Sequence, residues 1–160
     1  MRHRVAGRRL GLPTDQRMAL LNNLVTSLLW HGSVVTTVTR AKEARSIAEK
    51  LISIAREDSV HRRRLARRVL QPRTGLLRMK EGSYREMPVG GEASKSSLAG
   101  GSASSVANSV RHLFEHVGPQ YQDRPGGYTR IVRVGPRRGD GVMQAKLELV
   151  DYRAPELKEK

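Results

Sequence analysis

Residues 128–150, YTRIVRVGPRRGDGVMQAKLELV, decide the fold. Two runs rich in β-branched and apolar residues, 128–134 and 142–150, flank the turn-forming sequence GPRRGDG. Apolar residues in the second run alternate with polar ones: Met143, Ala145, Leu147 and Leu149. A period of two is typical of a strand with one buried face. The stretch therefore predicts a β-hairpin that carries Arg137 and Arg138 at its tip.

A helix and a further strand are expected near the start of the chain. Apolar residues recur at helical spacing after Thr14, which can cap the helix, and Gly32 is a natural stop. The apolar positions of this helix are Met18, Leu21, Val25 and Leu28. The short run 33–38, SVVTTV, is β-branched and predicts a strand.

Three further helices complete the expected fold. The first follows Thr39 and has a wide apolar stripe. That stripe consists of Ala44, Ile47, Ala48, Leu51, Ile52 and Ala55. The second runs from residue 58 or 59 to about residue 70, with a thin apolar side made of Val60, Leu65 and Val69. The third covers residues 106–117, where Gly118-Pro119 is expected to end it. About four helices packed on a small sheet of about three strands predict an α+β fold.

Composition divides the chain into four parts. Residues 1–13 are predicted to form an extended basic arm that stays disordered until an anion orders it. Residues 14–152 are predicted to form a single domain. Residues 72–105 are rich in Gly, Pro and Ser and predict a flexible insertion within that domain. Residues 153–160 form a polar tail.

The charge of the chain indicates a polyanionic partner. Thirty Lys and Arg residues oppose fifteen Asp and Glu residues, which gives a formal charge of +15, and 23 of the thirty are Arg. Arg grips phosphate with a planar fork and stacks on bases, so nucleic acid is the first partner to consider. The chain has no cysteine, which excludes disulfides, thiolate zinc sites and cysteine nucleophiles. No apolar run reaches the roughly 18 residues of a membrane helix, so no membrane partner is expected.

Two groups of cations are candidate nucleic-acid contacts. The first is the arm, with Arg2, His3, Arg4, Arg8 and Arg9. The second is the run RRRLARR, with Arg62, Arg63, Arg64, Arg67 and Arg68. Like charges on one helix side repel each other, and a polyanion would remove that cost. The alternatives are a solvated tail for the arm and a solvated helix face for the run. The density of Arg favours the binding interpretation for both.

The segment PGGYTRIVRV is a third candidate. Gly126-Gly127 allows close approach of another chain, Tyr128 offers a plane for stacking, and Arg130 offers a phosphate fork. Alternatively, the two glycines form a tight turn and Tyr128 packs across the sheet. The sequence leaves both interpretations open.

Catalysis is poorly supported. His112 and His116 stand at i and i+4 of a predicted helix, but no further His or Cys lies nearby to complete a metal site. A satisfied or exposed pair is the better interpretation. No phosphate-binding GxxxxGK[ST] loop is present. We expect no enzyme, no cofactor, no metal and no small-molecule substrate.

Several short motifs, taken in order, resemble one family. They are MRHRVAGRRL at the start, TT followed by AKEAR, IARED with SVHRRRLA, and GGYTRIVRVGPRRGD with AKLELVD. This set is similar to the bacterial large-subunit ribosomal protein seventeen family over residues 1–70 and about 107–152. The chain departs from the family at 72–105, because the family usually passes almost directly from the arginine helix to the next helix.

The resemblance implies an α+β domain near the peptide tunnel exit of the large subunit. It implies contacts with rRNA and no catalysis. We also expect neighbouring large-subunit ribosomal proteins as partners and a location on cytoplasmic ribosomes, in preference to mitochondrial or plastid ones. Residues implied or inferred to contact RNA, besides the arm and the arginine run, are Arg17, Asn22, Asn23, Thr36, Thr37, Tyr128, Thr129, Arg130, Arg133, Arg137 and Arg138.

Two other classes of protein stay open on the residues alone. A nucleoid-type DNA-binding protein would share the charge, but the sequence shows no helix-turn-helix with a short Gly turn. An RNA-processing enzyme would need a carboxylate cluster, and Asp123, Asp140 and Asp151 are scattered in the sequence.

Overall fold

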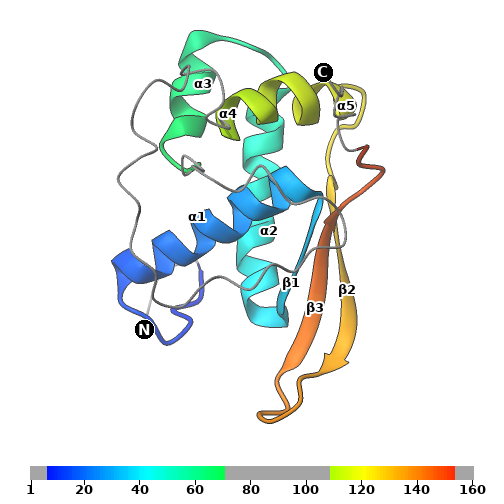
Figure 1. Ribbon diagram of the computed structural model, residues 1–160. Helices are drawn as coiled ribbons and strands as arrows, with labels where there is room; N and C mark the ends of the chain where they lie inside the picture. Colours follow the sequence, from blue (N-terminus) through cyan, green and yellow to red (C-terminus); the bar gives the residue numbers. More distant parts are fainter. Residues whose placement is uncertain (1–6, 71–108, 154–160) are drawn as a thin grey trace, which may run out of the picture.

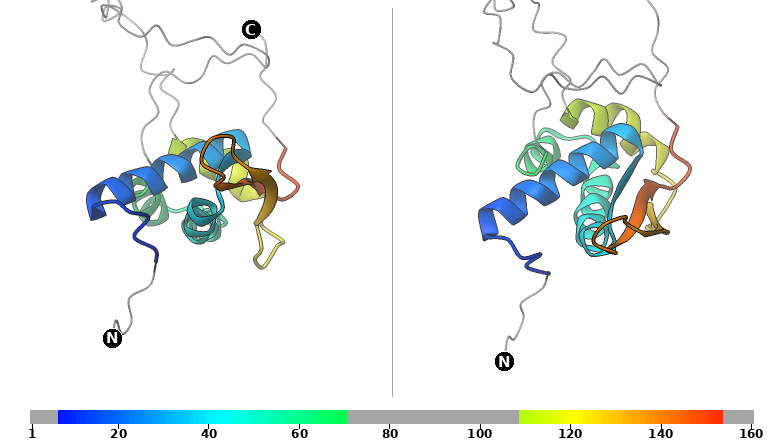
Figure 2. Two further views of the ribbon diagram at one scale, coloured as in Figure 1. Left: turned by 90° about the horizontal axis from the view of Figure 1, so that it is seen from below. Right: turned by 60° about the horizontal axis from the view of Figure 1, so that its bottom comes forward.

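The computed structural model describes residues 7–70 and 109–153, which form an α+β domain (Figure 1). Within these ranges four helical segments pack with one three-stranded antiparallel sheet of strand order β1-β3-β2. The predicted fold class is confirmed. The sheet lies along one side of helix α2, as both views of Figure 2 show. The predicted insertion at 72–105 lies outside the described residues, as does nearly all of the predicted tail.

Helix α1 spans Thr14–His31 and ends where predicted. Gly32 adopts a left-handed conformation, with φ of 74°, and its N–H donates to the carbonyl of Leu28. A side chain at Gly32 would also collide with the ring of Tyr152, so glycine is required for two reasons. The start differs by one residue, because Pro13 holds the cap position and Thr14 is already helical. Leu21, Val25 and Leu28 are buried, whereas Met18 lies beyond the core and is exposed.

Strand β1, Ser33–Thr37, leads directly into helix α2, Val38–Ala55. Thr37 rather than Thr39 holds the cap position, and the two hydroxyl oxygens lie 3.2 Å apart. The predicted apolar stripe of α2 is confirmed, with Ile47 only half-buried. Small alanines on that stripe let α1 and the sheet approach α2 closely.

The predicted hairpin consists of β2, Thr129–Pro136, and β3, Met143–Leu149. β3 pairs with β1 on its other side, so that Leu147 stands opposite both Val34 and Ile131. Ala145, Leu147 and Leu149 are buried as the alternation predicts. Met143 is exposed, because the hairpin extends beyond the first turn of α2 and leaves the core behind (Figure 1). An irregularity between Arg133 and Gly135 bends this outer part of β2.

Helix α3 spans Val60–Arg67, and Ser59 caps it by accepting from the backbone N–H of Arg62 at 3.2 Å. Its contact with the core is only partly the predicted one, because Val69 packs against the core and Leu65 is half-buried, whereas Val60 is not part of the contact. Val60 is 67% exposed, and the buried residues are Ala66 and Leu70. The sequence pattern missed Ala66 because a small residue among arginines gives a weak apolar signal.

The last helical segment runs through α4, Ser109–His112, a π-helical turn η2, Leu113–Val117, and α5, Gly118–Gln120. The expectation that Gly118-Pro119 ends this helix is wrong, because Gly118 is helical and Pro119 occupies the first turn of α5. A Cβ at Gly118 would lie 2.4 Å from the carbonyl oxygen of Ala55. Gly118 therefore permits close contact with the end of α2.

Candidate nucleic-acid interface

The described part of the arm is folded against the domain rather than free. Leu12 N–H donates to the carbonyl of Arg9 at 3.2 Å, and both central residues of this turn, Leu10 and Gly11, have positive φ. The side chain of Leu10 packs against the core. Arg17 on α1 donates to the carbonyl of Arg8 at 3.2 Å. Residues 7–13 thus contain a turn held against the domain, in place of the extended conformation expected for 1–13. Arg2, His3 and Arg4 lie outside the described residues.

The turn separates two consecutive arginines into two depressions. The first, here called the threonine pocket, has a volume of about 410 Å³. It is lined by Arg8, Leu10, Thr37, Thr39, Arg40, Arg137 and Val142. These residues come from the arm, the start of α2 and the hairpin tip. Three arginines and two threonines therefore border one small volume, and these residue types suit a phosphate and its ribose.

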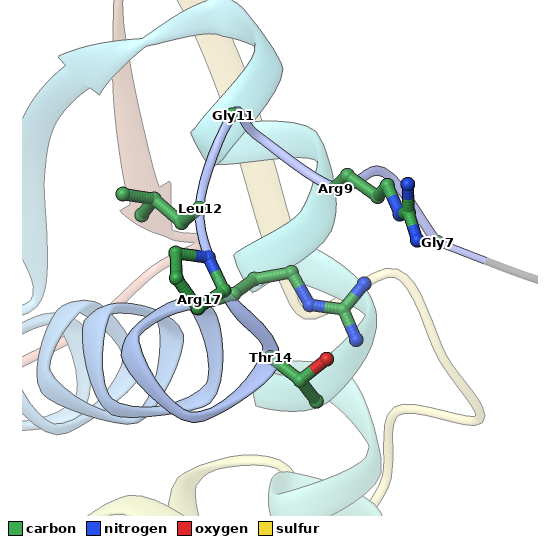
Figure 3. Close-up of a pocket in the computed structure, with 7 residues that line it drawn as sticks. Gly7, Arg9, Gly11, Leu12, Thr14 and Arg17 are labelled. Carbon is green, nitrogen blue, oxygen red and sulfur yellow. The ribbon is translucent and has the colours of Figure 1, made fainter.

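The second depression, here called the helix-start pocket, has a volume of about 680 Å³. It is lined by Gly7, Arg9, Gly11, Leu12, Pro13, Thr14 and Arg17. Figure 3 shows the guanidinium groups of Arg9 and Arg17 on the same side of the chain, above Thr14. The Nε atom of Arg17 is buried and has no hydrogen-bond partner among the described residues. No side chain caps the start of α1, whose first N–H groups add positive potential here.

The arginines of α3 divide into two kinds. Arg62 donates to the carbonyl of Ile54 and contacts Glu57, and Arg63 makes two hydrogen bonds to Asp58 at 2.7 and 2.6 Å. The hydrogen bonds from Arg63 hold the pKa of Asp58 below its usual value. Arg63 also lies over the ring of Phe114, 5.4 Å from its centre. By contrast, the exposed side chains Arg64, Arg67 and Arg68 have no ion-pair partner in the part of the chain that the structure describes.

The hairpin arginines are partly neutralised. Arg130 pairs with Glu148 at 2.9 Å, and Lys146 contacts the same carboxylate at 3.0 Å. Hydrogen bonds from Lys146 and Arg130 lower the pKa of Glu148. At the tip Arg137 pairs with Asp140, and this hydrogen bond lowers the pKa of Asp140 to about 2. Within residues 7–70 and 109–153, Arg133 and Arg138 have no such partner.

Tyr128 and Thr129 face the interior, which corrects one expectation. The ring of Tyr128 is 2% exposed and meets Tyr121 edge-on, with ring centres 5.5 Å apart. The hydroxyl of Thr129 donates to Glu49 at 2.9 Å. The burial of Tyr128 favours the packing interpretation over the stacking one, but its ring packs on Tyr121 beside α5 rather than across the sheet. Tyr128 also lines, together with Gly126 and Gly127, a depression of about 530 Å³ beside α2. Gly126 and Gly127 remain at the surface.

The other polar candidates are distributed along α1 and β1. Asn23 is exposed, whereas Asn22 is half-buried and its side-chain oxygen has no hydrogen-bond partner among the described residues. Thr36 and Thr37 are half-buried at the end of β1, and only Thr37 lines the threonine pocket. Arg40 and Thr39 line the same pocket and were not predicted from the sequence. The only sequence feature that could have indicated Thr39 and Arg40 is their position directly after the predicted contacts Thr36 and Thr37.

His112 has a structural role rather than a metal-binding one. Its Nε2 lies 3.1 Å from the carbonyl oxygen of Leu29 and 3.2 Å from the hydroxyl of Tyr152. Burial lowers the pKa of His112 to about 4, and the neighbouring His116 and His31 act in the same direction. Within residues 7–70 and 109–153, no group of three His, Cys, Asp or Glu side chains is arranged to hold a metal ion.

Comparison with known proteins places the chain in a family. The family model described as Ribosomal protein L17 matches residues 20–150. The chain belongs to the ribosomal protein L17 family. Among its relatives named "Large ribosomal subunit protein bL17", that of Dictyoglomus thermophilum is 45% identical over 150 residues, covering 94% of this chain and all of the relative. That of Carboxydothermus hydrogenoformans is 43% identical over 142 residues, covering 89% of this chain and 96% of the relative.

Membership of the L17 family confirms the resemblance and the expectation of a ribosomal protein rather than an enzyme. It also argues against the nucleoid-type and RNA-processing alternatives, which the residues alone left open. Within the described ranges, no helix of this L17 family member is long and apolar enough to cross a membrane.

Proposed function

We propose that this protein is a structural constituent of the large ribosomal subunit and binds rRNA through its basic arm, its hairpin tip and the outer arginines of α3. The observation that carries the proposal is the threonine pocket. Arg8, Arg40 and Arg137 come from three separate segments of the chain and border one depression. In the free protein Arg8 and Arg137 contact Glu43 and Asp140, whereas Arg40 has no ion-pair partner among the described residues. The three arginines together still leave an excess of positive charge at this depression, which attracts a phosphate group.

The family relationship supports the choice of RNA over DNA. The relatives are named as proteins of the large ribosomal subunit. Residues 14–152 then act as one rRNA-binding domain, with the arm as its extension. The resemblance further suggests a position near the peptide tunnel exit, next to other large-subunit proteins on ribosomes of the cytoplasm.

The first test compares two arginines on the same helix. Arg40 lines the threonine pocket, whereas Arg45 is paired with Glu49 at 3.0 Å. Arg40→Gln should weaken binding to large-subunit rRNA fragments and lower the slope of log affinity against log salt by about 0.7–0.9, as expected when one phosphate is no longer neutralised. Arg45→Gln makes the same charge change and should alter the slope less. Equal effects of the two variants would contradict a role for the pocket.

The second test uses the absence of cysteine from the chain. A single cysteine introduced by Arg138→Cys can carry an iron chelate that cleaves nearby RNA. In reconstituted large subunits, cleavage of rRNA around the tunnel exit is the expected result. Cleavage confined to another region would refute the proposed location, and cleavage of added duplex DNA at equal efficiency would favour the nucleoid-type alternative.

A further inference from the structure

The base of the arm is held by contacts from two helices. Arg17 on α1 donates to the carbonyl of Arg8 at 3.2 Å. On α2, Glu43 Oε1 lies 3.6 Å from Nε of Arg8, and a Cβ built at Gly7 would lie 3.5 Å from Glu43 Oε2. The turn at Leu10 and Gly11, with φ of 59° and 71°, completes the attachment because Leu10 packs on the core.

A left-handed conformation at Leu10 is unusual, because a bulky side chain there is strained. This strain is compensated by the contacts on either side of the turn. The turn directs Arg8 into the threonine pocket and Arg9 into the helix-start pocket. The local conformation therefore determines where two adjacent cations are presented.

Glu43 is in an unfavourable place for a protein that binds a polyanion. Its side chain is 20% exposed and lies next to Arg8, at the edge of the surface inferred to contact RNA. A carboxylate here repels phosphate. On simple electrostatic grounds its removal should strengthen RNA binding.

We propose that Glu43 is a positioning residue that holds Arg8 and the base of the arm in their binding conformation before RNA arrives. This inference rests on the proposed function. The closest approach to Glu43 is through Nε of Arg8. At 3.6 Å this contact is an ion pair rather than a hydrogen bond, so it does not use up the N–H donors with which Arg8 can bind a phosphate. Binding RNA with the arm already held avoids the entropic cost of ordering it.

The two interpretations of Glu43 predict opposite changes in RNA affinity when its charge is removed. Simple repulsion of phosphate predicts tighter binding, whereas a positioning role predicts weaker binding. Glu43→Gln should weaken rRNA binding by about threefold to tenfold, the size expected when one or two side chains must be ordered on binding. The salt slope should change little, because the same phosphates are bound in the complex. Glu57→Gln is the matched control, since it removes one negative charge at the other end of α2, where Glu57 contacts Arg62. The control should leave affinity unchanged or raise it slightly.

A second variant tests whether the amide oxygen of Gln can replace the carboxylate. A measurement without RNA tests whether Glu43 restrains the arm in the free protein. Glu43→Ala removes the carbonyl acceptor that Gln retains and favours the helix, so it should fold and should weaken binding at least as much. In the free protein, backbone ¹⁵N relaxation at residues 8 and 9 should show greater mobility in either variant, with an unchanged melting temperature. An increase in affinity, or unchanged mobility, would overturn the proposal.

The failure of this inference can be separated from failure of the proposed function. If Arg8→Gln leaves rRNA affinity unchanged, the proposed role of the arm is wrong. If Arg8→Gln weakens binding while Glu43→Gln strengthens it, the arm binds RNA and only the positioning role is wrong. If Glu43 acts through Arg8, then Glu43→Gln should cause little further loss in a chain that already carries Arg8→Gln. If the losses in binding free energy of Glu43→Gln and Arg8→Gln add fully in the double variant, Glu43 does not act through Arg8.

Discussion

Arginine has two roles in this chain, and the nearest acceptor decides which role each residue takes. Arg63 and Arg64 are consecutive in the sequence, yet Arg63 binds Asp58 and covers Phe114, whereas Arg64 is exposed. A run of arginines in a sequence indicates a basic surface but cannot say which members are directed inward. The groups that Arg63 contacts lie in the preceding loop and in another helix. Arg63 is therefore better regarded as part of the fold, and Arg64 as part of the candidate interface.

His112 provides a prediction at the scale of one residue. It is 7% exposed, and burial lowers its pKa from 6.5 to about 4. Between these pH values the unfolded chain binds a proton that the folded chain does not, so stability is lost as pH falls from about 6.5 to 4. The expected loss is about 1–2 kcal/mol, after allowance for partial solvent screening of the shift. Urea unfolding at pH 7 and pH 4.5 measures it.

Two variants isolate the contribution of His112. His112→Gln can still bond to the carbonyl of Leu29, and it should lose less stability between pH 7 and pH 4.5 than the unmodified protein. His116→Gln removes an exposed histidine of the same helix and should largely keep the pH dependence. If His112→Gln and the unmodified protein lose the same stability over this range, another group is responsible.

At the scale of elements, the π-helical turn brings the last helix against α2. The N–H of Gly118 donates to the carbonyl of Leu113, five residues back, and Pro119 follows without an N–H of its own. The turn lies where Phe114 and Val117 are buried and where Gly118 meets the backbone of Ala55. The widened turn accompanies this close approach between two helices.

Gly118 gives a prediction at this scale. Gly118→Ala should destabilise the protein by about 1–3 kcal/mol, the typical cost of overpacking, because the new Cβ meets a rigid carbonyl at 2.4 Å. The gain in helix propensity, up to about 1 kcal/mol, is smaller. Gly126→Ala is the control, since no described atom lies within 4 Å of an added Cβ there. A lower melting temperature for Gly118→Ala alone is expected, and equal values for both variants would contradict the helix contact.

The elements that the sequence predicted well are those whose pattern is local. The alternation in β3 and the stripe of α2 each contain enough positions to identify the buried face. Gly118 was wrongly predicted to end its helix. A glycine is needed there because the carbonyl of Ala55 lies close to it, and a contact between distant segments cannot be read from a local pattern. The candidate interface behaves in the same way. Arg8 and Arg137 could be predicted as RNA contacts from the clusters of arginine in the sequence. That they line one pocket together with Arg40 depends on the tertiary fold.

At the scale of the whole molecule, the cations inferred to bind RNA lie at two ends. The threonine pocket is at the start of α2, and α3 follows its end (Figure 1). Helix α2 has 18 residues, so its ends are about 27 Å apart at 1.5 Å per residue. This separation exceeds a Debye length of about 8–10 Å, so the two groups influence each other little, and we expect them to contact different parts of an RNA.

The separation leads to a prediction about additivity. Replacing Arg64, Arg67 and Arg68 by Gln should lower the salt slope of rRNA binding, by about 0.7–0.9 for each phosphate that is no longer neutralised. Replacing Arg8 and Arg40 should do the same at the other end. Because the sites are far apart and share no partner, the losses in binding free energy should add to within about 0.5 kcal/mol when all five changes are combined. Salt titrations of the three variants measure this. A combined loss much smaller than the sum would mean that the two ends compete for one RNA segment, and an unchanged slope for the α3 variant would leave those arginines as a solvated face.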